Sequence, residues 1–220
     1  MDAPVGLPVL LPLYGHPTAD PQAWRPASRL GPGVTVVARR GVSGSDPELA
    51  GAMARLRAGG VEVLGRVDTA YATRPVADLL DDVTTWAEYP AVGIFLDRVP
   101  TSPFSIGPVA VAVRAARRAG LATVVLNPGA PPDPLYRSLP ARVCSFDGPW
   151  SHYLRWDAAG SRPGDGHLVH AVPADRLPEA WCLLRRRGAG FGLATDLAGD
   201  RPYDGAPSWL SAVAADPVAG

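Results

Sequence analysis

Short apolar segments alternate with amphipathic segments along almost the whole chain, and this alternation strongly limits the folds open to it. Such short runs, flanked by Gly, Pro or Asp, are typical of strands buried on both faces of a parallel sheet. A regular strand–helix alternation indicates an α/β fold, and eight repeats predict a single-domain (β/α)8 TIM-type barrel over residues 1–220. The eight predicted strands are Val9–Tyr14, Val34–Ala38, Glu62–Asp68, Ala91–Leu96, Thr123–Leu126, Arg142–Phe146, Leu168–Val172 and Phe191–Ala194.

The segments between these strands have the patterns of helices. Asp46 followed by Pro47 suits an N-cap with proline at the first helical position. An open doubly wound sheet is the alternative, but no Gly-x-Gly-x-x-Gly stands at a strand-to-helix junction to support it. The predicted helices are Pro47–Ala58, Pro75–Trp86, Gly107–Ala119, Pro173–Arg187 and Ser208–Ala215.

The composition excludes several classes of function. Net charge is zero, so the chain has no electrostatic footprint for nucleic acid or for an anionic membrane. All 21 basic residues are arginines. The absence of lysine excludes Schiff-base chemistry, pyridoxal-phosphate attachment and a phosphate-loop lysine. We therefore expect neither a nucleic-acid nor a membrane partner, and no cofactor.

The apolar content, the two cysteines and the N-terminal segment indicate the size of the core, the state of the thiols and the location of the protein. Hydrophobic residues make up 47% of it, enough for a large core. Cys144 and Cys182 lie in a predicted strand and a predicted helix, and we expect both to be buried free thiols. Met1–Pro12 has no basic region of the signal-peptide type, so we expect a cytoplasmic protein, or a secreted one if a leader has been removed.

Polar and aromatic side chains follow most of the predicted strands. The carboxyl ends of barrel strands share one face, where ligands bind. Asp97, which ends the apolar run Val92–Leu96, is the leading candidate, and Asp147 is the second. Each aspartate has an alternative role as a local turn or helix cap, and each aromatic as rim packing. The remaining candidates on this face are Tyr14, His16, Asp68, Thr69, Tyr71, Arg98, Asn127, Trp150, Thr195 and Asp196.

Facing carboxylates with aromatic rings nearby are typical of the active sites of glycoside hydrolases. One carboxyl group protonates the leaving oxygen, and the other attacks carbon or activates water. Tyr14, Tyr71 or Trp150 could stack on the apolar face of a sugar. A metal-dependent lyase or isomerase is a weaker alternative, because no close ligand spacing such as His-x-x-x-His is present. We therefore expect no metal site.

Motifs along the chain resemble those of the spherulation-specific family 4, or spherulin-4-like, proteins. The resemblance implies a (β/α)8 barrel and a relationship to glycoside hydrolase family 135, which cleaves galactosaminogalactan-type polymers. It covers nearly the whole chain, in order, with motifs at most strand ends. These motifs are Leu11-Pro12-Leu13-Tyr14, Val63-Leu64-Gly65-Arg66-Val67, Thr69-Ala70-Tyr71, Gly93-Ile94-Phe95-Leu96-Asp97, Val125-Leu126-Asn127-Pro128-Gly129, Ala194-Thr195-Asp196 and Pro202-Tyr203-Asp204.

The chain departs from the family pattern at two acidic positions. In such relatives the fourth strand ends in Asp-Glu and the sixth in a catalytic Glu, whereas here the residues are Asp97-Arg98 and Asp147. Asp is shorter than Glu by roughly 1.5 Å, which matters because retaining and inverting glycosidases differ in carboxyl separation. Arg98 would keep Asp97 ionised, as a nucleophile or stabiliser. Asp147 would then be the general acid, with its pKa raised by apolar surroundings that Trp150 could supply.

Two functions follow from this reading. The first is a glycoside hydrolase acting on an amino-sugar-containing or other α-linked glycan through Asp97 and Asp147. The second is a barrel that binds a glycan or a sugar-bearing small molecule without cleaving it. The two departures from the family favour the second, and the presence of both carboxylates at strand ends favours the first.

Overall fold

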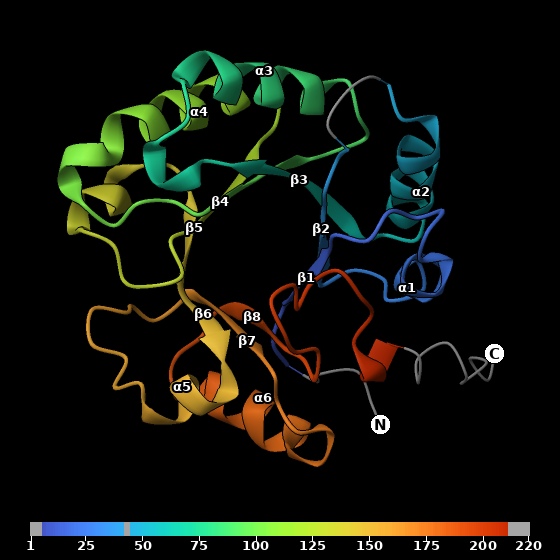
Figure 1. Ribbon diagram of the computed structural model, residues 1–220, viewed down its shortest axis with the longest axis vertical. Coiled ribbons are helices and arrows are strands. Elements are labelled where there is room, and N and C mark those ends of the chain that lie inside the picture. Colours follow the sequence, from blue (N-terminus) through green and yellow to red (C-terminus); the bar gives the residue numbers. More distant parts are fainter. Residues whose placement is uncertain (1–5, 42–44, 211–220) are drawn as a thin grey trace.

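Eight parallel strands form a closed barrel in sequence order, and the last strand pairs back to the first (Figure 1). The computed structural model describes residues 6–41 and 45–210. The predicted (β/α)8 barrel is confirmed, and the open doubly wound sheet is excluded. The strands are β1 (Val9–Leu13), β2 (Val34–Ala38), β3 (Glu62–Asp68), β4 (Gly93–Asp97), β5 (Thr123–Asn127), β6 (Arg142–Pro149), β7 (Gly166–His170) and β8 (Phe191–Ala194).

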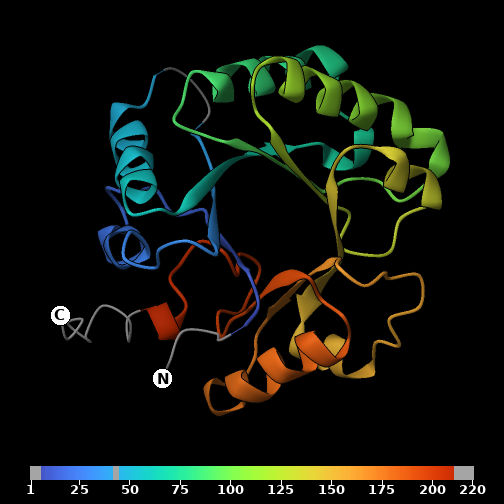
Figure 2. The ribbon, with the colours of Figure 1, turned by 180° about the vertical axis from the view of Figure 1, so that it is seen from behind.

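Helices surround the ring of strands, as the views from both sides show (Figures 1 and 2). The α-helices are α1 (Pro21–Ala27), α2 (Pro47–Ala58), α3 (Val76–Ala87), α4 (Ile106–Arg118), α5 (Trp150–Arg155) and α6 (Leu177–Arg186). Short 3-10 helices are η1 (Ala70–Ala72), η2 (Pro103–Ser105), η3 (Pro134–Ser138) and η4 (Ala174–Arg176).

The helix predictions hold in most places. Asp46 caps α2, since its carboxylate accepts a hydrogen bond from the Leu49 N–H at 2.9 Å and Pro47 is the first helical residue. The predicted helix Pro173–Arg187 begins instead as η4 and becomes α-helical at Leu177. The last predicted helix, Ser208–Ala215, runs beyond Leu210 and so largely lies outside the described residues.

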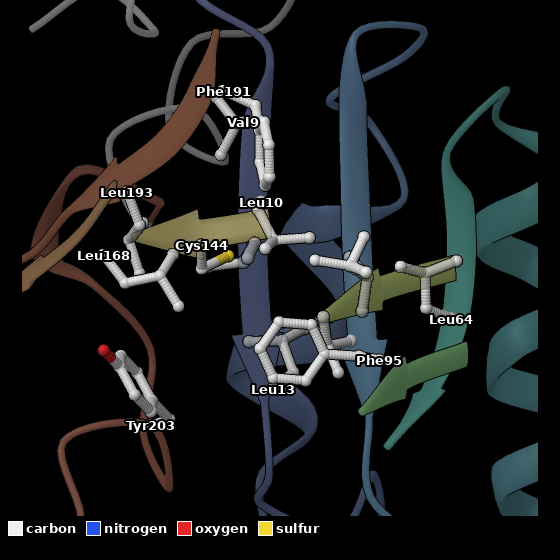
Figure 3. Close-up of a cluster of buried hydrophobic side chains, with 14 of the residues drawn as sticks. Val9, Leu10, Leu13, Leu64, Phe95, Cys144, Leu168, Phe191, Leu193 and Tyr203 are labelled. Carbon is white, nitrogen blue, oxygen red and sulfur yellow. The ribbon is translucent and has the colours of Figure 1, made fainter. Parts of the chain in front are cut away.

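Apolar side chains from several strands fill the barrel (Figure 3). Val9 and Phe191 lie at one end of the cluster, whereas Leu13 and Tyr203 lie at the other end (Figure 3). On the outer side of the sheet, Gly65 faces α3, where an added Cβ would come within 2.0 Å of the Trp86 ring. Glycine therefore lets α3 pack directly on β3.

Strand β6 carries an irregularity that decides which way its end points. Cys144 pairs with Gly166 but Phe146 pairs with the very next residue, His167, so the register shifts by one between them. Phe146 packs outside the barrel against Tyr153, with ring centroids 4.7 Å apart. A bulge of this kind re-aims the following side chain, and Asp147 consequently faces the other strand ends.

Several details differ from the sequence predictions. Strand β7 begins and ends two residues earlier than predicted, and β6 extends three residues further. Both cysteines are free, but only Cys144 is buried; Cys182 is exposed on α6, whose polar face points to solvent. Within residues 6–41 and 45–210, no helix has the length and apolar character needed to cross a membrane.

Candidate functional site

Two carboxylates and one amide meet where β4, β5 and β6 end. Asp97 and Asn127 are the last residues of β4 and β5, and they stand opposite each other in the sheet register. The Asn127 amide nitrogen donates to Asp97 Oδ1 at 3.0 Å and to Asp147 Oδ2 at 2.7 Å. Because both oxygens contact the same nitrogen, they are separated by at most the sum of those distances, 5.7 Å.

Asp147 has the environment of a carboxylic acid that holds its proton. Burial raises the pKa of Asp147 to about 6, and the negative charge of Asp97 adds to the rise. Hydrogen bonds from Tyr203 and Asn127 act in the opposite direction, because they stabilise the charged form. The Tyr203 hydroxyl donates to Asp147 Oδ1 at 2.5 Å. Asp147 is only partly enclosed, so a bound molecule can reach it.

Arg66, and not Arg98, provides the cation beside Asp97. Arg66 Nε donates to Asp97 Oδ2 at 2.7 Å, and Arg66 Nη2 donates to Asp68 at 3.2 Å. The Arg98 guanidinium turns instead to Asp68, where Nε donates at 2.7 Å. Only the backbone N–H of Arg98 reaches Asp97, at 2.9 Å. The turn after β4 directs the Arg98 side chain over β3, so its guanidinium contacts Asp68 and not Asp97. The effect of the Arg98 charge on Asp97 stays a prediction.

Asp68 is the second anion that these arginines hold. Burial opposes its ionisation, but hydrogen bonds from Arg98 and from the Ala70 N–H outweigh it and lower the pKa of Asp68. Polar contacts thus run without a break from Tyr203 through Asp147, Asn127, Asp97, Arg66 and Asp68 to Arg98.

The loops that follow β3 and β4 are held in strained conformations. Ala70, Tyr71 and Ala72 all have positive φ, at 45°, 56° and 65°, and Arg98 has φ of 51°. The left-handed region costs roughly 1–2 kcal/mol per non-glycine residue. The Arg98 carbonyl links the two loops, since it accepts from the Thr69 hydroxyl at 2.6 Å and from the Tyr71 N–H at 2.7 Å. Such strain clusters at functional sites.

Aromatic rings line the side of the site near β1. The Tyr14 and Tyr203 rings meet edge to face with centroids 5.8 Å apart, and the His170 ring meets Tyr203 at 6.2 Å. The guanidinium of Arg66 lies 5.1 Å from the Tyr14 ring centroid. His170 Nδ1 is buried without a hydrogen-bond partner among the described residues.

Other predicted site residues serve the scaffold instead. His16 Nε2 contacts Asp46 at 2.9 Å and so ties the loop after β1 to the cap of α2. Thr195 is buried and accepts from the Leu197 N–H at 3.1 Å. Asp196 accepts from the Ser208 N–H at 3.0 Å. These contacts tie together loops at the carboxyl face.

The remaining predicted residues lie at or behind the rim. Thr69 is fully buried and holds the Arg98 turn. Tyr71 is 57% exposed, and the Arg98 guanidinium lies 5.9 Å from its ring centroid. Trp150 is the first residue of α5 and packs in the core beside Tyr153, with centroids 6.3 Å apart. The prediction that Trp150 stacks on a sugar at the rim is wrong, because the residue is only 7% exposed.

Sequence reasoning missed three residues of the site: Arg66, His170 and Tyr203. Arg66 had a signal, because a side chain two residues before Asp68 in a strand points to the same face. Tyr203 also had a signal, because it lies in the motif Pro202-Tyr203-Asp204 that supports the family resemblance, but its place in a loop after the last strand gave no indication of its partner. Over residues 6–41 and 45–210, no group of three His, Cys, Asp or Glu side chains is arranged to hold a metal ion.

Comparison with known proteins places the chain among characterised sequences and folds. The model of spherulation-specific family 4 matches residues 8–215. Spherulin-4 of Physarum polycephalum is 30% identical over 159 residues, which cover 67% of this chain and 48% of that protein. The chain therefore spans about half the length of this relative.

A solved structure shares the fold. The crystal structure of Aspergillus clavatus Sph3, in complex with GalNAc, matches with a TM-score of 0.79 and 23% sequence identity. The match covers 94% of this chain and 95% of the Sph3 chain. The structural likeness supports the barrel, while the family match extends across nearly every residue described above. The chain belongs to spherulation-specific family 4.

Proposed function

We propose that this protein is a glycoside hydrolase that retains the configuration of the anomeric carbon. The observation that carries the proposal is the pair of carboxylates at the barrel mouth, whose facing oxygens lie within 5.7 Å because they share the Asn127 nitrogen at 3.0 and 2.7 Å. Retaining glycosidases have carboxyl separations of about 5–5.5 Å, and inverting enzymes about 6.5–9.5 Å. The spacing here supports the retaining mechanism.

Asp147 is the general acid of the proposed reaction. Its pKa of about 6 leaves a protonated fraction near neutral pH, so the carboxyl group can donate to the leaving oxygen. The neutral group is favoured mainly because it is buried and faces the charge of Asp97. After the leaving group departs, the same carboxylate takes a proton from the attacking water.

Asp97 is the carboxylate that attacks or stabilises the anomeric carbon. Arg66, the Asn127 amide and the Arg98 N–H all donate to it, so its negative charge is stabilised by three groups. The same three donors fix its orientation, and such positioning supports attack along one direction.

The proposed substrate is an amino-sugar-containing or other α-linked glycan, and one comparison supports the amino sugar. Sph3 was solved in complex with GalNAc, and Asp97 and Asn127 lie in motifs on which the family resemblance rests. Tyr14 is partly exposed in the mouth of the barrel, where its ring can face the apolar side of a sugar.

A binding function without hydrolysis is the second candidate, and one observation favours it. Every carboxylate oxygen of the pair already accepts a hydrogen bond: Asp97 from Arg66, Arg98 and Asn127, and Asp147 from Asn127 and Tyr203. For catalysis, the Asp147 proton must reach a substrate oxygen while these bonds rearrange. A carboxylate pair held in this way can also serve to bind sugar hydroxyls.

The test is release of reducing ends from amino-sugar and neutral oligosaccharides, with binding measured by calorimetry. We expect Asp97→Asn and Asp147→Asn each to lower kcat by about 100-fold or more, with binding retained, because each removes a carboxyl group that takes part in the chemistry. Asp200→Asn changes an exposed carboxylate in the loop after β8 and is the control. NMR of the first product should show the anomeric configuration of the substrate.

Two outcomes would contradict the proposal. Glycan binding with no turnover by the wild type would favour the second candidate. Turnover that survives in both variants would mean that other groups perform the chemistry.

A further inference from the structure

A pocket of about 380 Å³ lies between the carboxyl ends of β2 and β3 and the helix α3. It extends outward toward α3. Arg66 and Asp68 line it and also belong to the polar chain described above, so a single side chain, Arg66, separates the pocket from Asp97. The lining residues are Arg39, Arg40, Gly41, Arg66, Asp68, Arg74, Asp82 and Trp86.

The pocket lining is rich in positive charge. It contains four guanidinium groups but only two carboxylates, a surplus of two positive charges. One of these carboxylates, Asp82, is shared by two arginines, since Arg74 contacts it at 2.9 Å and Arg40 at 3.4 Å. The other, Asp68, is held by Arg98 from outside the pocket as well as by Arg66.

Arg39 and Arg40 are the least engaged of the four arginines. Arg39 lies 3.5 Å from Asp204, which is also 3.7 Å from Arg201. Arg40 donates to Asp82 at 3.4 Å and lies 5.8 Å from the Trp86 ring centroid, and its Nε is buried without a hydrogen-bond partner among the described residues. A guanidinium carries five N–H donors, so both side chains retain donors for a further acceptor.

We propose that this pocket binds an oxyanion group carried by the substrate, the carboxylate of a uronic acid or the phosphate of a phosphorylated sugar. Planar guanidinium groups match the oxygens of such anions, and charge-assisted hydrogen bonds are the strong ones. Arg66 joins the two sites, since it lines the pocket and donates to Asp97. The charged group thus belongs to the sugar that occupies the proposed catalytic site or to its neighbour.

This inference rests on the proposed function, because it names the chemical class of that enzyme's substrate. A site for neutral sugars needs only hydroxyl and amide groups, and a surplus of arginines would have no partner in such a site. The buried Arg40 Nε has no hydrogen-bond partner among the described residues and costs free energy in that state, and an anion that accepts from it would relieve that cost.

The test is calorimetric binding of matched charged and neutral probes. Methyl glucuronoside, its neutral methyl ester and glucose 6-phosphate are titrated into the wild type at low and at high salt. We expect each anionic probe to bind roughly tenfold or more tightly than the neutral ester, because hydrogen bonds to charged groups are the stronger kind. The advantage should shrink at high salt, since partly exposed charges are screened. The tighter of the two anions identifies the source of the oxyanion.

Two double variants locate the effect. Arg39→Gln with Arg40→Gln should reduce the advantage of the anions to about twofold or less, as expected if their hydrogen bonds are lost. Arg57→Gln with Arg118→Gln removes equal charge from the far ends of α2 and α4 and should preserve the advantage. Thermal melts check folding, and Arg39→Lys with Arg40→Lys should recover part of the preference because the charge returns.

Three results would overturn the inference: equal binding of charged and neutral probes, a preference unchanged in the Arg39 and Arg40 variant, or no binding of either anion. These results are independent of the proposed hydrolysis. Anion binding without turnover of any glycan would contradict the proposed hydrolase but support the anion site. Hydrolysis of neutral glycans without anion binding would support the hydrolase but contradict the anion site.

Discussion

Asn127 is the residue that determines the geometry of the site. Its amide nitrogen is bonded to both Asp97 and Asp147, while its oxygen is buried without a partner among the described residues. An amide is suited to this position because it provides two N–H donors from one atom and carries no charge of its own. Two carboxylates this close repel, so one proton is retained by the pair at a higher pH than usual.

Tyr203 affects how tightly Asp147 holds its proton. Tyr203 donates to the charged form of Asp147, and this bond lowers the pKa of that carboxyl group against the effect of burial. Tyr203→Phe removes the bond, so the pKa of Asp147 should rise above about 6. If Asp147 is the general acid, the alkaline limb of kcat/KM should move up by roughly one pH unit.

The control for this variant is Tyr136→Phe, which removes a hydroxyl that donates to the Ser102 carbonyl at 2.9 Å, away from the carboxylates. Its pH profile should match that of the wild type. A profile that is also unchanged in Tyr203→Phe would mean that Asp147 does not control the alkaline limb.

At the scale of the elements, β6 and the β3–α3 contact position the site. Without the register shift between Cys144 and Phe146, regular alternation would turn Asp147 outward, toward the helices. On β3, alternation directs Arg66 and Asp68 to the mouth and Gly65 to α3. The helix can lie close to the strand only because residue 65 has no Cβ, as the distance of 2.0 Å to the Trp86 ring indicates.

We therefore expect Gly65→Ala to destabilise the protein by roughly 3 kcal/mol, because overpacking of this severity forces the helix or strand to move. The free energy of unfolding from chemical denaturation measures the effect. Gly107→Ala is the matched control, since an added Cβ there meets no atom within 4 Å. Alanine at position 107, in the first turn of α4 and before Pro108, should change the free energy of unfolding by less than about 1 kcal/mol. Equal stabilities of the two variants would contradict the packing argument.

At the scale of the whole molecule, closure of the barrel brings together residues that are distant in the chain. Tyr203, in the loop after β8, reaches Asp147 at the end of β6, and Arg66 of β3 reaches Asp97 of β4. The barrel also encloses Asp147 enough to raise its pKa, and this burial has a cost for stability when the group ionises.

Because the ionised form of Asp147 is costly to bury, the free energy of unfolding should depend on pH. The pKa of Asp147 is about 6 in the folded protein, above an unfolded value of about 3.9. The proton is bound more tightly in the folded state, so the stabilisation is fully present below about pH 4 and is lost as the pH rises through about 6. The wild type should therefore lose roughly 2 kcal/mol relative to Asp147→Asn between pH 4 and pH 7.5.

Chemical denaturation of both proteins across this range measures the difference. Asp81→Asn, on the exposed side of α3, is the control for loss of one carboxylate from the surface. A difference between the wild type and Asp147→Asn that stays constant with pH would show that Asp147 does not hold its proton more tightly in the folded state.

The sequence by itself determined the class of fold and identified the three central residues as candidates on the carboxyl face. Eight apolar segments and their caps are local features, so periodicity and N-cap chemistry were enough to predict the barrel and the start of α2. Asp97 and Asn127 follow regular strands and could be placed on the carboxyl face by counting.

Only the tertiary structure decided which side chains meet there. The Arg98 side chain contacts Asp68 and not Asp97, and Trp150 packs in the core. Arg66 and Tyr203 donate to the two carboxylates. The orientation of Asp147 depended on a bulge that pairing with β7 reveals and that no local pattern of β6 predicts. Contacts across a closed barrel depend on register and curvature, and those are fixed by the packing of all eight strands together.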